Sequence, residues 1–121
     1  MRIRVSFGDS ILLRGNVTLT AYHEGLGTEK ALVTSDRGRL DTETDELWAE
    51  GNTVLIIQAD GRRIESYELR YIPNDDRIRS DSATVMYDGD IIIEGTSFTS
   101  DLNFEHVVIQ NARTRGGSVR F

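Results

Sequence analysis

Cysteine is absent from this chain of 121 residues, and proline occurs once, at Pro73. Without cysteine there are no disulfides, no thiol nucleophile and no zinc ribbon, although this does not fix the compartment, because many exported proteins also lack cysteine. No segment approaches the roughly 18 to 20 consecutive apolar residues of a membrane span, and the opening MRIRVSF is too short and too charged for a signal peptide. We therefore expect any membrane anchor of the natural protein to lie outside this sequence.

Basic residues are outnumbered by acidic ones, 14 to 20, which gives a formal net charge of −6 at pH 7. A protein that binds a nucleic-acid backbone ordinarily presents a face rich in lysine and arginine. The composition therefore excludes nucleic acid as the expected partner. The length suits one domain, residues 1–121, that can bury a modest core, and the polar, glycine-rich tail from about residue 112 is predicted to be partly disordered.

Apolar and polar residues alternate with a period of two along most of the chain, which predicts an all-β fold of antiparallel strands. Examples are the segments 17–22, 67–71 and 82–87. Turn signals separate the strands at HEGLG, SDRG, DTETD, ADGRR, PNDD, YDGD and TRGG. The segment TETDELWAE is interpreted as a turn and a short strand, because Gly51 and Asn52 would end a helix after about two turns.

A Gly-Asn pair followed by an apolar strand occurs at Gly15 and again 36 residues later at Gly51, and a Gly-Thr variant follows at Gly95. Such a repeat indicates structural units of short strands that share one dry interior. Glycine at these positions favours a β-bulge or a close approach of two backbones.

Residues with catalytic or metal-binding chemistry are few, and we predict no catalytic residue, no metal site and no cofactor. The chain has two histidines, His23 and His106, and no Gly-x-Ser-x-Gly motif. The Ser-Asp pairs at 35–36, 80–81 and 100–101 are interpreted as turn formers. The acidic run 41–46 lacks the spacing of an EF-hand loop and is interpreted as a solvated turn, and His23 beside Glu24 as a surface hairpin.

Three stretches together resemble the periplasmic LptC and LptA bridge proteins of lipopolysaccharide export. They are LRGNVTLTAYHEG, LVTSDRGRLDTETDELWAEGNTVLIIQADGRRIESYELRY and DRIRSDSATVMYDGDIIIEGTSFTSDLNFEHVVIQNARTRG, and the resemblance covers about residues 11–116. The most specific element is Gly95-Thr96-Ser97-Phe98, which comes after a strand that follows Ser80-Asp81 and a short turn. The transmembrane helix that anchors typical LptC proteins is not in this sequence.

The resemblance implies a folded-over β-jelly roll, or β-taco, open along one side and at both ends, whose apolar lining holds the acyl chains of lipopolysaccharide without catalysis. Alternation places the expected lining at Val17, Leu19, Leu40, Leu47, Val54, Ile56, Leu69, Val85, Ile93 and Phe98. Periodicity alone favours a closed core, because inward apolar residues are ordinary in β proteins, and only the resemblance favours the open groove. The run 54–57 is apolar on both faces, so it is either buried on both sides or faces a partner or the lipid.

The resemblance also implies a place in a protein bridge in the periplasm, tethered to the inner membrane in the full-length protein. The first strand, residues 2–7, and the last, residues 104–111, contain no proline that would block strand addition. We expect inner-membrane ABC transporter subunits at the N-terminal edge and an LptA-like protein at the C-terminal edge. The residues expected at this C-terminal edge are Phe104, His106, Val107, Val108 and Ile109.

Two interpretations of other classes remain open. A carbohydrate-binding β-sandwich would use a platform of exposed aromatic residues, but Trp48 is the only tryptophan. A β-solenoid-like scaffold would polymerise through exposed strand edges. Co-purifying acyl chains would support transport, whereas salt-stable polymers without lipid would support the scaffold.

Overall fold

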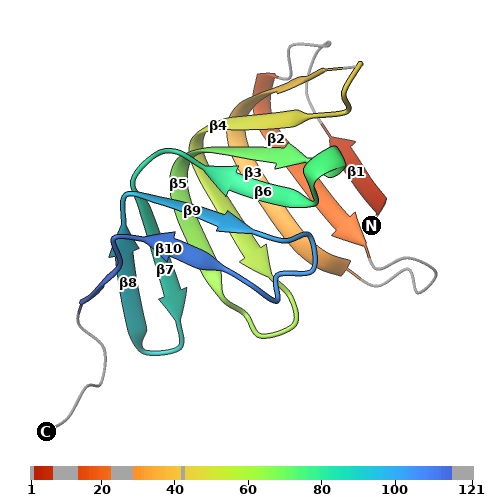
Figure 1. The fold of residues 1–121 in the computed structure, drawn as a ribbon. Coiled ribbons are helices and arrows are strands. Elements are labelled where there is room, and N and C mark those ends of the chain that lie inside the picture. The colour runs from red at the N-terminus through yellow and green to blue at the C-terminus, as the bar shows by residue number, and fades with distance from the viewer. Residues whose placement is uncertain (1, 7–13, 23–28, 42, 116–121) are drawn as a thin grey trace, which may run out of the picture.

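The computed structural model describes residues 2–6, 14–22, 29–41 and 43–115, and it confirms the all-β prediction (Figure 1). Eleven strands form one antiparallel sheet, and the described residues include no α-helix, only a 3₁₀ turn, η1, at Pro73–Asp75. No helix in the described part of the chain has the length and apolar character needed to cross a bilayer.

The first five strands form a meander in which each strand pairs with the next. Their bounds are β1 Arg2–Ser6, β2 Arg14–Tyr22, β3 Glu29–Leu40, β4 Leu47–Ile57 and β5 Arg63–Ile72. The acidic run between β3 and β4 forms the predicted turn: Asp41 Oδ1 accepts hydrogen bonds from the backbone N–H groups of Glu43 and Thr44. Long strands, of 9 to 12 residues in β2 to β5, take the place of the expected units of short strands.

After β5 the sheet divides into two branches. Residues 70–72 of β5 pair with β6, Arg77–Ser80, and residues 63–66 pair with β7, Thr84–Asp88. The first branch continues through β9, Ser97–Ser100, to β10, Val108–Gln110. The second continues through β8, Ile91–Gly95, to β11, Arg113–Arg115, which lies in the tail that was predicted to be partly disordered. Figure 1 shows β6, β9 and β10 lying across the layer formed by β3, β4 and β5.

The Gly-Asn repeats mark β-bulges, where the register shifts in β2 between Arg14 and Val17 and in β4 between Glu50 and Thr53. Gly51 and Asn52 have φ angles of 84° and 46°, and Asn52 Nδ2 donates to Asp36 Oδ2 at 2.9 Å. These φ values lie in the left-handed region that favours glycine and asparagine. The predicted structural use of glycine is therefore confirmed at Gly51.

The predicted turn at SDRG is wrong, because residues 35–38 lie within β3. The strand shifts register here, between Thr34 and Arg37, opposite the bulge in β4. Ser35 is buried and its hydroxyl donates to the backbone oxygen of Arg37 at 2.9 Å. A side chain that bonds its own backbone serves a bulge as well as a turn, so the sequence signal did not distinguish the two.

Candidate functional site

One continuous apolar cluster fills the space between the two layers of the folded sheet. It takes side chains from the meander and from both branches, and hydrophobic groups at Tyr71, Ile93, Leu102, Val107 and Ile109 pack against it. The buried members are Val17, Ala31, Val33, Leu47, Ala49, Leu55, Ile57, Ile64, Leu69, Ile78, Met86, Phe98 and Phe104. This interior is the candidate functional site, because the apolar lining predicted from the sequence was expected to lie in it.

Five of the ten predicted lining residues contribute to this interior. Val17, Leu47, Leu69 and Phe98 are buried, and Ile93 packs against the cluster. Leu40 pairs with Leu47 at the end of β3, where its side chain is 38% exposed, so it lies at the rim. The side chain of Leu19 lies outside the part of the structure that is described.

The other three predicted residues, Val54, Ile56 and Val85, lie on the outer face, and their assignment to the same lining as Leu47 is wrong. In β4 the burial alternates without a break from Leu47 to Ile57, so the odd-numbered residues point inward. The side chain of Leu55 is therefore fully buried, and those of Val54 and Ile56 are half-buried on the other face. In β7, Thr84 and Met86 are buried, which places Val85 outside.

Polar residues occupy inward positions in β4 and β7, and in β7 they explain the error. Thr53 and Thr84 are buried, and each hydroxyl donates to a backbone oxygen: that of Thr53 to Tyr67 at 3.2 Å and that of Thr84 to Ser82 at 2.9 Å. Hydrogen bonding lowers the cost of burying a hydroxyl. Pattern analysis counted threonine as an outward residue, and so it inverted the phase of β7.

Loop 101–107, between β9 and β10, closes one side of the interior. Phe104 is only 4% exposed and belongs to the core, although its φ angle of 57° is unusual for a bulky residue. The loop is held by Asp76 Oδ1, which accepts the backbone N–H of Leu102 at 3.3 Å, and by two cations described below. Phe104 was predicted at the partner edge, and that assignment is corrected, since its side chain points into the protein.

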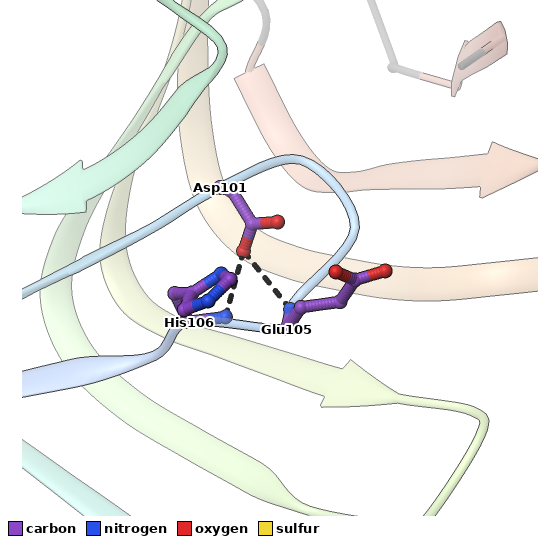
Figure 2. Close-up of side chains that lie close together, drawn as sticks. All are labelled: Asp101, Glu105 and His106. Carbon is purple, nitrogen blue, oxygen red and sulfur yellow. Dashed lines mark hydrogen bonds between the residues drawn. The ribbon is translucent and has the colours of Figure 1, made fainter.

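The same loop brings together the ligand atoms of Asp101, Glu105 and His106, which all lie within 4.8 Å of one another (Figure 2). One oxygen of Asp101, Oδ1, accepts the backbone N–H groups of Glu105 and His106, each at 2.9 Å. Burial raises the pKa of Asp101, but hydrogen bonds from the backbone N–H groups of His106 and Glu105 outweigh it and leave the pKa below its ordinary value. These hydrogen bonds explain why the three side chains lie close together, since they fix the conformation of the loop.

Two guanidinium groups lie over the indole ring of Trp48, on the outer face of the sheet. Arg39 is 4.2 Å and Arg70 4.6 Å from the ring centroid, and these residues lie on the strands that flank β4. Each guanidinium group lies over the ring at the distance of a cation–π contact. A sugar would have to compete with these two side chains for the indole ring, which weakens the case for a carbohydrate platform.

Among the described residues, the strands at the ends of the sheet pair on one side only. The strand path begins at β1 and ends at β10, while β11 ends the second branch. Of the predicted edge residues, Val108 and Ile109 belong to β10, with Val108 47% exposed and Ile109 opposite Phe98 on the inner face. His106 is exposed and Val107 half-buried, and both lie in loop 101–107. The predicted last strand is thus shorter than expected.

Comparison with known proteins gives one family. A family model described as "Lipopolysaccharide-assembly, LptC-related" matches residues 9–116, which is most of the chain. A comparison with curated proteins finds no match.

Proposed function

Because the chain belongs to the LptC-related family of lipopolysaccharide-assembly proteins, we propose that it binds lipopolysaccharide acyl chains in the interior between its two layers. The family has a role in the lipopolysaccharide transport bridge, so the task is to carry a lipid and not to convert it. In this proposal the protein receives lipid from the inner-membrane transporter and passes it toward the outer membrane.

The observation that carries the proposal is the continuous apolar cluster inside an open sheet. A closed barrel has no free strand edge, whereas in the described part of the chain β1, β10 and β11 each pair with one neighbouring strand only. An acyl chain gains about 0.8 kcal/mol for each CH₂ group that it buries, so an interior of this kind suits lipid tails. The outer face carries the charged side chains of Arg37, Glu50, Arg70 and Asp81.

We place the protein in the periplasm, as its family indicates, with tethering to the inner membrane as a further part of the proposal. Subunits of the inner-membrane lipopolysaccharide ABC transporter dock at the β1 edge. An LptA-like bridge protein adds a strand at the C-terminal edge beside β10. Strand addition joins backbone hydrogen-bonding groups across the two chains, so it would extend the inner face from one protein into the next.

Lipopolysaccharide binding by a matched pair of variants tests the interior assignment. Leu69→Ser changes a buried inward residue, and Ile56→Ser makes a comparable change on the outer face. We expect Leu69→Ser to weaken the binding of fluorescent lipopolysaccharide roughly tenfold, since one apolar side chain contributes about 1.5 kcal/mol or more to such contacts. Ile56→Ser should bind as the unchanged protein does.

Far-UV circular dichroism must show that both variants keep their β structure. Equal binding by the two folded variants would contradict the interior assignment. Mass spectrometry of the protein purified from a Gram-negative host tests the remaining alternative, a self-assembling scaffold. Polymers that survive high salt and contain no lipid would favour this scaffold, because the edge strands of the described sheet could pair between copies of the chain.

A further inference from the structure

Two cations from separate elements hold adjacent residues of loop 101–107. Lys30, in β3, donates from Nζ to Asn103 Oδ1. Arg62, which follows the β4–β5 turn, donates from Nη2 to the backbone oxygen of Phe104 at 3.1 Å. Both contacts join the meander layer to a loop of the other layer, so they close the interior at this side.

The two cations are also close along the sheet. The backbone oxygen of Lys30 accepts the N–H of Gln58 at 3.0 Å, and the backbone oxygen of Arg62 accepts the N–H of Ile57 at 2.9 Å. Because residues 57 and 58 are consecutive, Lys30 and Arg62 flank one point at the end of β4. Ile57 itself is buried in the apolar cluster. The cations therefore lie where the apolar interior ends.

Lys30 is the only lysine in the chain, and it is 7% exposed. A buried ammonium group is costly unless an anion or several hydrogen bonds compensate it. Among the described residues, the acceptor found for the Lys30 ammonium group is the neutral amide oxygen of Asn103, which offsets less of that cost than an anionic oxygen does. Arg62 is already paired with Asp60 at 2.8 Å and is mostly buried. The position of Lys30 is thus suited to a negatively charged group.

The backbone conformation of Phe104 favours displacement of loop 101–107 from the interior. Its left-handed backbone conformation costs on the order of 1 kcal/mol or more for a bulky residue, and such conformations persist where the surroundings enforce them. The loop nevertheless places the phenyl ring in the apolar cluster and offers two oxygen acceptors to Lys30 and Arg62. An apolar group beside oxygen acceptors is the chemistry of an amphiphile with a polar head.

We propose that Lys30 and Arg62 bind the anionic head of an amphiphile whose chain lies in the interior cluster, and that loop 101–107 occupies this site until the amphiphile displaces it. The inference rests on the proposed function, and it adds the residues that recognise the polar end of the lipid. An alkyl phosphate has the required chemistry: a phosphate oxygen replaces Asn103 Oδ1 at Lys30, and the alkyl chain replaces the ring of Phe104.

Calorimetric titration of the intact chain with three probes, kept below any micelle concentration, tests this site. Dodecyl phosphate carries both the chain and the charge, dodecyl maltoside carries the chain with a neutral head, and inorganic phosphate carries the charge alone. We expect dodecyl phosphate to bind most tightly. Amide hydrogen exchange at Leu102, whose N–H donates to Asp76, should become faster when dodecyl phosphate binds, because the loop moves away.

Three variants assign the effect to residues. Lys30→Met keeps the length of the side chain without its charge, and we expect about a tenfold loss of affinity for dodecyl phosphate with no loss for dodecyl maltoside. Arg77→Met removes the same charge from an exposed position on β6 and should change neither affinity. Asn103→Ala, at an exposed residue, releases Lys30 from its internal partner and should tighten the binding of dodecyl phosphate.

The outcomes separate this inference from the proposed function. If both dodecyl compounds bind but Lys30→Met loses no more affinity than Arg77→Met, the head-group site is wrong while the lipid-binding interior stands. If inorganic phosphate binds as tightly as dodecyl phosphate, the site holds a free anion and not an amphiphile, which also overturns the inference. If neither dodecyl compound binds the folded protein, both proposals fail.

Discussion

Gly95, at the end of β8, is the residue where the two branches of the sheet meet, and Gly95→Ala is the sharpest test of that junction. A methyl group added at Gly95 would overlap Ile109 Cγ2 and the backbone oxygen of Gln110 on β10. That same oxygen accepts the backbone N–H of Thr96 at 3.0 Å, so it cannot move without loss of a hydrogen bond. Asn111 Nδ2 also donates to the Thr96 hydroxyl at 3.0 Å beside it.

The size of the effect follows from this overlap. To restore ordinary contact distances, β10 must retreat from Gly95 by about 1 Å, against a backbone atom and not a flexible side chain. Overpacking of this kind costs about 1 to 3 kcal/mol, and we expect Gly95→Ala to reach the upper half of that range. For a domain of this length, 2 to 3 kcal/mol lowers the Tm by roughly 8 to 12 °C. Urea and thermal unfolding, followed by far-UV circular dichroism, measure both quantities.

Gly61→Ala provides the matched control. Gly61 has a φ of 76°, but nothing lies within 4 Å of an added methyl group, so this variant reports backbone strain alone, about 1 kcal/mol. Ile109→Ala removes one of the two overlapping groups at Gly95. In that background Gly95→Ala should cost less than it does alone, because neighbouring residues couple. The reasoning fails if Gly95→Ala costs no more than Gly61→Ala, or if Ile109→Ala brings no relief.

Three further predictions concern the edge, the strand phase and the loop. Because the chain lacks cysteine, Val108→Cys should form a disulfide with a single cysteine in the first strand of an LptA-like partner, and absence of cross-linking to the folded variant would count against edge docking. Leu55→Ala should lower the free energy of unfolding by about 3 kcal/mol and Ile56→Ala by about 1 kcal/mol; equal losses in urea unfolding would refute the corrected phase. The folded-state pKa of Asp101 is lowered, so its stabilising effect is present above the unfolded pKa of about 3.9 and is lost as the pH falls through the folded value. Hydrogen exchange or NMR of the Glu105 amide should show acid loosening of loop 101–107, and Asp101→Asn should not share that pH dependence.

The fold class could be predicted from the sequence because alternation and turn residues are local signals. Residues 41–46, 58–62, 73–76 and 89–90 separate strands where turn signals predicted it. Gly51 and Gly95 were correctly assigned to a bulge or a close approach, since few other residues tolerate either. The branching of the sheet after β5 could not be predicted, because strand pairing depends on contacts between distant residues.

The sequence predicts which residues of a strand point inward only where the other face of that strand is polar. In β4 the residues 54–57 are all apolar, so the pattern contains no information on which pair faces inward. The structure resolves the choice through the neighbours: Leu55 lies opposite Val33 and Ile64, both buried. Phe104 was missed for a different reason, since a buried aromatic residue in a loop has no periodicity to reveal it.

In the proposed bridge, the branching of the sheet determines what a partner meets at the C-terminal end. The strands β10 and β11 belong to different branches but follow one another in the chain. At Gly95, β10 contacts β8, and β8 also pairs with β11. A partner strand added to β10 would continue the row of Phe98 and Ile109, and therefore the inner face. The same junction stands close to loop 101–107, which ends where β10 begins. A methyl group at Gly95 should consequently disturb partner docking and loop closure together, whereas Lys30→Met should alter head-group binding and leave docking unchanged.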